Sequence, residues 1–167
     1  MARETVYLET SVVSYYTARA SRDVIVLAHQ QITQDWWKTA VDRFEIFISE
    51  IVVEEAGAGD ADAAEKRLEA IKNFAHLELT AETERLAEQY VRELEIPHKA
   101  IRDSVHLALA SIHQVDYLVT WNCTHIANGR VMKRVREINA ANGIPSPIIC
   151  TPEELLESET DVERPDR

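Results

Sequence analysis

The order of its segments constrains this chain most: short β-prone runs alternate with longer stretches that have helical spacing. Five runs have the β-branched, aromatic or apolar character of strands, at residues 5–9, 45–49, 76–79, 117–121 and 147–150. At least one helical stretch separates each run from the next. Because parallel neighbours in a sheet need crossover connections, this order predicts an α/β fold. The expected architecture is a mostly parallel sheet of about five strands, covered on both faces.

The stretches between these runs show the periodicity of amphipathic helices. Helices are expected over residues 11–19, 23–43, 51–55, 61–74, 80–94, 99–114, 126–142 and 152–157. Thr10 and Ser11 are hydroxyl residues suited to capping the first of these helices. Folds of this class bind ligands at the carboxyl ends of their strands, so functional side chains are expected at that edge.

Length and composition favour one globular domain. A chain of 167 residues, 46% of them hydrophobic, buries roughly 70% of its unfolded surface in a single core. We expect one domain over residues 1–157 and a charged, disordered tail over residues 158–167. No apolar run reaches the roughly 20 residues of a membrane span, and two cysteines make no disulfide framework. The sequence therefore predicts a cytoplasmic protein with no membrane contact.

The net charge limits how this chain can bind a polyanion. With 18 Lys and Arg against 29 Asp and Glu, the formal charge is -11, which repels nucleic acid and anionic lipid. A polyanionic substrate must therefore be recruited by a local feature. The densest positive patch, in the helix expected over 126–142, either binds RNA phosphates or is a solvated helix face; it consists of Arg130, Lys133, Arg134 and Arg136.

Acidic and amide side chains follow several of the predicted strands. Glu9 ends the first strand, Glu54 and Glu55 follow the second, Asp103 opens a helix, and Asn122 follows the fourth strand. Taken alone, Glu9 ends a strand, Glu54 and Glu55 are solvated helix residues, and Asp103 is a cap-region charge that interacts favourably with the helix dipole. Gathered together, they would repel one another unless a cation neutralised them. Mg²⁺ prefers oxygen ligands, so their joint placement predicts a divalent-cation site capable of hydrolysing a phosphodiester.

Four segments resemble the successive motifs of a known family. They are YLETSVVSYY at 7–16, SEIVVEEAGAGD at 49–60, RDSVHLALA at 102–110 and LVTWNCTHI at 118–126. Together, and in this order, they are similar to the motifs of PIN-domain proteins. The resemblance implies a PIN-like three-layer α/β/α sandwich. It also implies a metal-dependent ribonuclease similar to the VapC-type toxins of toxin-antitoxin pairs.

The resemblance assigns roles to particular residues. Glu9 stands where the family usually has its first Asp, and Ser11 matches the hydroxyl that follows. Glu55 matches the second acid, with Glu54 as an alternative. The remaining matches are the third acid, a histidine one turn later, and a position where a fourth acid is frequent: Asp103, His106 and Asn122.

Two departures from the family pattern bear on the metal. Glu9 is one methylene longer than Asp, and Asn122 lacks a charge. Glu9, Glu55 and Asp103 therefore leave three formal charges, which suit one Mg²⁺ or Mn²⁺ ion better than two. In the expected mechanism the ion promotes the in-line attack of water on phosphorus, and Ser11 orients ligand or water.

Other chemistry-bearing residues have structural interpretations. His106 and His113 share a helical face, but no further ligand completes a zinc set, so satisfied, partly buried histidines are expected. The pairing of Cys123 with His125 lacks a positioned third group. Trp36 and Trp37 either pack in the core or stack on bases, and packing is favoured.

The main functional hypothesis is a metal-dependent endoribonuclease that forms a homodimer and binds an antitoxin protein. The homodimer and the antitoxin are implied by the resemblance alone. A second hypothesis is an inactive PIN-like module that binds RNA or protein, favoured by Glu9, Asn122 and the acidic surface. A third is a metal phosphatase acting on small substrates. The residues do not identify the RNA target or the native ion.

Overall fold

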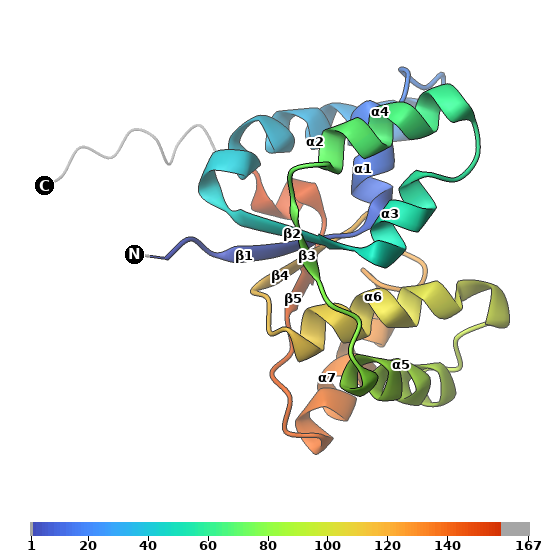
Figure 1. Ribbon diagram of the computed structural model, residues 1–167, viewed down its shortest axis with the longest axis vertical. Helices are drawn as coiled ribbons and strands as arrows, with labels where there is room; N and C mark the ends of the chain where they lie inside the picture. The colour runs from blue at the N-terminus through green and yellow to red at the C-terminus, as the bar shows by residue number, and fades with distance from the viewer. Residues whose placement is uncertain (1, 158–167) are drawn as a thin grey trace, which may run out of the picture.

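The computed structural model describes residues 2–157, so the predicted tail over 158–167 lies outside the described residues. Five parallel strands form one sheet in the order β3-β2-β1-β4-β5, with helices on both faces (Figure 1). The predicted α/β class and strand number are confirmed. All four strand pairings are parallel, which is what crossover helices between consecutive strands require.

The strands are short and the helices long. The strands are β1 (Thr5–Leu8), β2 (Glu45–Ser49), β3 (Ala75–Leu77), β4 (Tyr117–Val119) and β5 (Ile148–Cys150). The α-helices are α1 (Thr10–Thr17), α2 (Val24–Arg43), α3 (Glu50–Ala56), α4 (Ala61–Ile71), α5 (Ala81–Glu93), α6 (Ile101–Ile112) and α7 (Gly129–Ala141). Two 3₁₀ turns, η1 (His98–Ala100) and η2 (Pro152–Leu155), complete the described elements.

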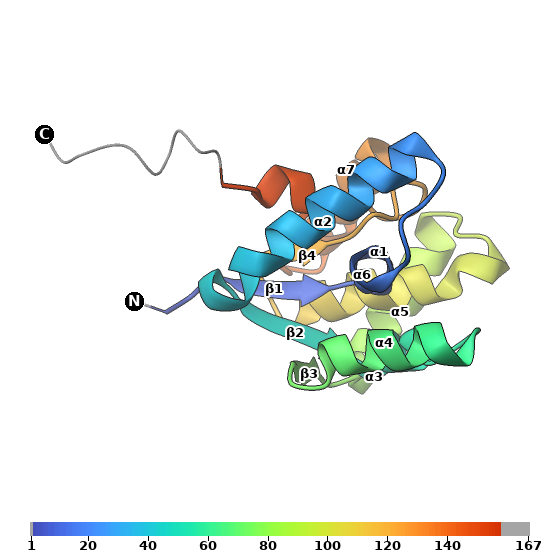
Figure 2. The ribbon, with the colours of Figure 1, turned by 90° about the horizontal axis from the view of Figure 1, so that it is seen from above.

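The strand order creates a switch point between β1 and β4. From β1 the chain adds β2 and β3 on one side, and then crosses back to add β4 and β5 on the other. Helices α1 to α4 therefore cover one face and α5 to α7 the other (Figures 1 and 2). Residues that follow β1 and β4 lie at the switch point, where open α/β sheets bind their ligands.

The core surrounds the central strand. Val6, Tyr7 and Leu8 of β1 are fully buried, because helices cover both faces of the sheet. Trp36 and Trp37 of α2 are also buried, which confirms packing as their role. Trp37 stacks on Tyr16 of α1 with ring centroids 4.0 Å apart. No described helix has the length and apolar character that a membrane crossing needs.

Several element boundaries differ from the prediction, among them the starts of two helices and the end of one strand. Helix α1 is capped by Glu9, whose carboxylate accepts a hydrogen bond from Ser11 N, and not by Thr10 or Ser11. The third strand ends at Leu77. Helix α7 begins at Gly129, because residues 122–128 form turns that an Asn side chain stabilises. The first and third differences place polar side chains at the carboxyl edge of the sheet.

Candidate functional site

Glu9 is fixed at the point where β1 enters α1. Its backbone N donates to Val119 O of β4 at 3.1 Å, which holds the two strand ends together. Its Oε2 accepts hydrogen bonds from Ser11 N at 2.7 Å and Thr120 Oγ1 at 3.2 Å. The residue is only 6% exposed. The carboxylate therefore sits at the positive end of the α1 dipole, with one oxygen engaged by the protein.

Glu55 and Glu54 point to different surroundings. Glu55 Oε1 lies 2.6 Å from His106 Nε2 and accepts a hydrogen bond from Thr10 Oγ1 at 2.8 Å. Glu54 instead forms an ion pair with Arg102 at 2.9 Å, and both of these side chains are about half exposed. Of the two glutamates, Glu55 is thus the one that contacts the start of α1 and the middle of α6.

His106 connects Glu55 to the core of the sheet. The side chain is fully buried, and its Nδ1 lies 2.7 Å from the Tyr7 hydroxyl. That hydroxyl lies 2.8 Å from Ser49 Oγ at the end of β2. A chain of hydrogen bonds therefore runs from β2 through β1 and α6 to α3. It sets the position of the Glu55 carboxylate.

Asp103 approaches from the first turn of α6. Its Oδ2 lies 3.0 Å from His125 Nδ1, and its side chain is 15% exposed. His125 belongs to the connection between β4 and α7, so this contact joins α6 to the edge of the sheet. One oxygen of Asp103 thus has a protein partner, as does one oxygen of Glu9 and one of Glu55.

The charges of all three carboxylates act on the buried imidazole of His106. Burial lowers the pKa of His106, but its contact with Glu55 and the charges of Glu9, Glu55 and Asp103 outweigh burial, so the pKa is raised. Burial raises the pKa of Glu9, and the nearby Glu55 charge adds to this. Burial acts in the same direction on Glu55, but the hydrogen bond and charge of His106 bring its pKa below the usual value. The imidazole thus contacts Glu55 and also responds to the charges of Glu9 and Asp103.

Each carboxylate keeps one oxygen without a protein partner. Glu9 Oε1, Glu55 Oε2 and Asp103 Oδ1 make no hydrogen bond to any residue in 2–157. They are not sealed from solvent, because Trp36 Nε1 is the one described side-chain nitrogen or oxygen that is both buried and unpaired. Within residues 2–157, no three His, Cys, Asp or Glu side chains form a ready-made metal cage. The donor set fits a hard cation that takes one or two carboxylates directly and keeps its waters.

Asn122 and Ser11 have mainly structural contacts. Asn122 Oδ1 accepts a hydrogen bond from His125 N at 3.0 Å, so its side chain closes the turn that carries His125. Ser11 Oγ accepts a hydrogen bond from Trp121 N at 2.8 Å and lies 3.4 Å from Thr120 Oγ1. Ser11 N bonds directly to Glu9 Oε2, whereas Asn122 is linked to Glu9 through Thr120, whose Oγ1 accepts from Asn122 N and donates to Glu9 Oε2.

Several residues that shape this region were missed or misread from the sequence. His106 is fully buried and central, where a partly buried structural histidine was expected. His125 was considered only with Cys123, whereas it contacts Asp103. Its position three residues after Asn122 was the available signal, since an Asn side chain often caps the backbone N–H three residues on. Tyr7 and Thr120 gave no sequence signal of a role at the site, because a Tyr or Thr in a predicted strand has an ordinary structural explanation.

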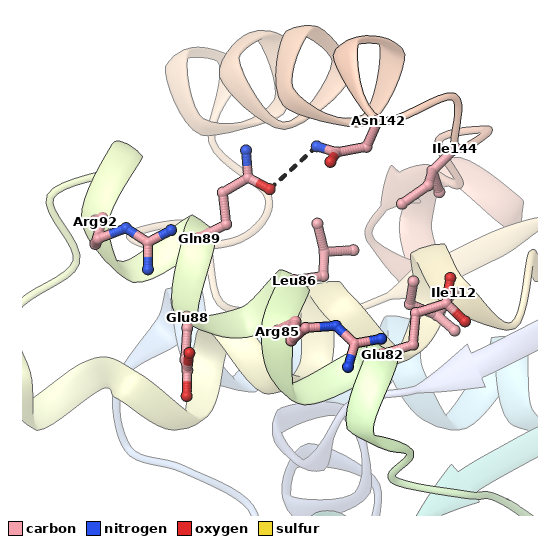
Figure 3. A pocket seen from close by; sticks show the side chains of 9 residues that line it. All are labelled: Glu82, Arg85, Leu86, Glu88, Gln89, Arg92, Ile112, Asn142 and Ile144. Carbon is pink, nitrogen blue, oxygen red and sulfur yellow. Dashed lines mark hydrogen bonds between the residues drawn. The ribbon is translucent and has the colours of Figure 1, made fainter.

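Polar groups elsewhere line a separate cavity. A cavity of about 540 Å³ lies between α5 and the end of α7 (Figure 3). A hydrogen bond of 3.1 Å from Asn142 Nδ2 to Gln89 Oε1 crosses it. Its lining contains none of the residues around Glu9, Glu55 and Asp103; it consists of Glu82, Arg85, Leu86, Glu88, Gln89, Arg92, Ile112, Asn142 and Ile144. This cavity is therefore distinct from the candidate site.

Comparisons with known proteins support the fold. No family model matches the sequence, and no curated protein matches it. Among solved structures, a similar chain occurs in the crystal structure of VapBC2 from Rickettsia felis bound to a DNA fragment from its promoter. The TM-score is 0.56 at 16% sequence identity, with 88% of this chain and 98% of that chain covered. The chain thus has an α/β fold similar to the PIN domain of VapC. At this identity the likeness concerns the fold alone.

Proposed function

We propose that this protein is a metal-dependent endoribonuclease that hydrolyses RNA phosphodiester bonds. Glu9, Glu55 and Asp103 hold one Mg²⁺ or Mn²⁺ ion, directly or through water. The observation that carries the proposal is geometric: each of the three carboxylates has one oxygen bound by the protein and the other without a protein partner. Glu55 also bonds to Thr10, the neighbour of Glu9, and Asp103 contacts His125 in the turn that follows β4. Acids that come from positions 9, 55 and 103 have no common structural need to meet at one edge of the sheet.

The protein anchors each carboxylate through one oxygen and leaves the other oxygen free to bind a metal ion or its waters. This is the arrangement in which surrounding hydrogen bonds orient metal ligands. A bound divalent ion supplies stabilisation of the charge that develops on the phosphoryl oxygens and promotes ionisation of the attacking water. The protein's part is positioning: Thr10 and His106 hold Glu55, whereas Ser11 N and Thr120 hold Glu9.

The polar residues near the acids set the number of ions and the placement of substrate. Asn122 carries no charge, and its Oδ1 is committed to a turn, so three carboxylates remain for one ion. Ser11 Oγ, beside Glu9, orients substrate or water. The side chains of Arg130, Lys133 and Arg136 on α7 are exposed, and they offer phosphate contacts that offset the net charge of -11.

A toxin of a toxin-antitoxin pair is the biological role that fits this proposal. The similar solved chain belongs to a VapBC2 complex bound to its promoter DNA. The start of α2 exposes large apolar side chains, with Val24 77%, Ile25 66% and Leu27 42% exposed. Apolar side chains gathered on one exposed helix end are typical of a protein interface. We propose that an antitoxin covers them, and that the protein forms a homodimer.

Cleavage of mixed RNAs in Mg²⁺ or Mn²⁺, with and without EDTA, tests the proposed activity. We expect cleavage that EDTA abolishes and that the divalent ion restores. A generic phosphomonoester in parallel separates a phosphatase from a ribonuclease. Binding of RNA without any cleavage in either ion would contradict the proposal and favour the inactive binding module.

A further inference from the structure

Three aromatic rings gather beside the candidate site. Trp121 follows β4, Tyr15 lies on α1 and His29 lies on α2. The His29 ring stacks on the Trp121 indole, with centroids 4.1 Å apart and planes 13° apart. Tyr15 meets both rings edge to face, with centroids 6.0 Å from Trp121 and 6.2 Å from His29. We call Tyr15, His29 and Trp121 the aromatic cluster.

Hydrogen bonds tie the aromatic cluster to Glu9. Ser11 N donates to Glu9 Oε2, and Ser11 Oγ accepts from Trp121 N at 2.8 Å. Tyr15 follows Ser11 by four residues, so the two lie on the same face of α1, one turn apart. The aromatic cluster therefore begins about 6 Å along α1 from the residue that holds Glu9. The neighbouring nucleotide of a substrate bound at the carboxylates reaches this distance.

The cluster is rigid on one side and open on the other. Trp121 Nε1 donates to the buried Thr33 Oγ1 at 2.8 Å, which fixes the indole, and Trp121 is only 9% exposed. Tyr15 and His29 are half-buried, and neither the Tyr15 hydroxyl nor a His29 ring nitrogen has a hydrogen-bond partner among residues 2–157. These polar atoms are not among the described atoms that are both buried and unpaired, so both rings have edges that solvent, and hence a ligand, can reach.

The connection between α1 and α2 places arginines beside this surface. Gln30, next to His29, binds both Ser21 N and Arg19 O, at 2.9 and 3.1 Å. This clamp holds the connection against α2. Arg19 and Arg22 are exposed, and their side chains form no hydrogen bond or ion pair with residues 2–157. They provide a local positive charge that an RNA strand extending from the carboxylates would contact.

We propose that the aromatic cluster binds an unpaired nucleobase next to the cleaved phosphate, with the base stacked on His29. The proposal rests on the proposed ribonuclease function. Stacking requires an exposed base face, so the substrate is single-stranded at this position. Every base has a π-face, so the cluster selects strandedness more than base identity. Stacking does not depend on Coulomb attraction, so the cluster adds affinity for RNA despite the net negative charge of the protein.

The test compares His29 variants with RNA that lacks one base. His29→Gln removes the ring and keeps a polar side chain, whereas His29→Phe keeps a ring. The matched control is His76→Ala, an exposed histidine on β3 at one edge of the sheet. The probes are a short fluorescein-labelled single-stranded RNA and the same RNA with one abasic nucleotide, placed at each position in turn. Affinity is measured as Kd in EDTA and as KM in Mn²⁺.

We expect His29→Gln to weaken binding of the intact RNA by about 5- to 150-fold, the range that stacking of one base supplies. One abasic position should weaken wild-type binding by a similar factor and have no further effect on the Gln variant. His29→Phe and His76→Ala should stay near wild type. Unchanged Kd and KM in His29→Gln, with cleavage intact, would overturn the stacking proposal and leave the ribonuclease proposal standing. Stacking-dependent binding without cleavage would support the cluster and contradict the proposed activity, and absence of RNA binding would overturn both.

Discussion

Nε2 of the fully buried His106 lies 2.6 Å from Oε1 of Glu55, although 51 residues separate the two along the chain. The same imidazole contacts Tyr7 through Nδ1 and is influenced by the charges of Glu9 and Asp103. Burying a charged imidazole is costly unless it is paired and hydrogen-bonded, and Glu55 supplies that pairing here. This arrangement therefore links the core of the sheet to the proposed metal centre.

Asp103→Asn is expected to abolish Mg²⁺- or Mn²⁺-dependent RNA cleavage while leaving thermal stability nearly unchanged. The amide keeps the shape of the side chain, but it is a weaker ligand for a hard cation. Asp62→Asn is the matched control, because Asp62 also lies in the first turn of a helix and is exposed. Cleavage assays and melting curves of both variants check this. Unaltered cleavage by Asp103→Asn would refute its role.

Glu55→Gln and Glu54→Gln should differ sharply in activity. Glu55 faces His106 and Thr10, whereas Glu54 pairs with Arg102 on the surface. We expect loss of cleavage in the first variant and near wild-type rates in the second. The stability cost of losing the exposed Glu54 pair is about 0–1 kcal/mol. Equal activity of the two variants would mean that Glu55 has no special role.

His106→Gln should destabilise the metal-free protein by less than about 3–5 kcal/mol, the cost of removing one partner of a fully buried ion pair, because the Glu55 side chain is 28% exposed. The pKa of His106 is raised, so its contribution is fully present below pH 6.5 and is lost as pH rises through the folded pKa. The pKa of Glu55 is lowered, so its contribution is present above pH 4.5 and is lost as pH falls.

The free-energy difference between wild type and His106→Gln should therefore shrink as pH rises above 6.5. Denaturant unfolding in EDTA at a series of pH values measures it. A difference that stays constant across that range would show that His106 does not change its protonation state there.

Native protein should react with a thiol reagent at one cysteine. Cys123 is exposed, whereas Cys150 on β5 is 2% exposed. Burial raises the pKa of the Cys150 thiol to about 12, so almost no reactive thiolate forms at pH 8. We expect one labelled thiol in native protein, two after denaturation and none in native Cys123→Ser. Rapid labelling of native Cys123→Ser would show that β5 opens readily.

The fold was largely predictable because its determinants are local. Strand runs such as residues 45–49 and 117–121 are bounded by helical periodicity, and the alternation leaves little choice but a parallel sheet. Boundaries were less predictable where side-chain chemistry decides them. The carboxylate of Glu9 replaces Thr10 and Ser11 as the cap of α1, since it occupies a strand end that brings it to Ser11 N.

The candidate site was predictable only in outline. Acids after strands are visible in the sequence, and the parallel topology brings strand ends to one edge. The partners of those acids come from elsewhere: His106 from the middle of a helix, Tyr7 from the core strand, and His125 from a turn. No periodicity reports contacts between residues as distant as 55 and 106. Trp121 gave no signal either, because an aromatic residue at the end of a predicted strand has an ordinary packing explanation.

A crystal structure of the protein soaked with Mn²⁺ tests the central claim most directly. We predict one anomalous peak within coordination reach of Glu9 Oε1, Glu55 Oε2 or Asp103 Oδ1, with waters completing its shell and Asn122 still bonded to its turn. Absence of density at this edge of the sheet at saturating Mn²⁺, with the three carboxylates unmoved, would contradict the account.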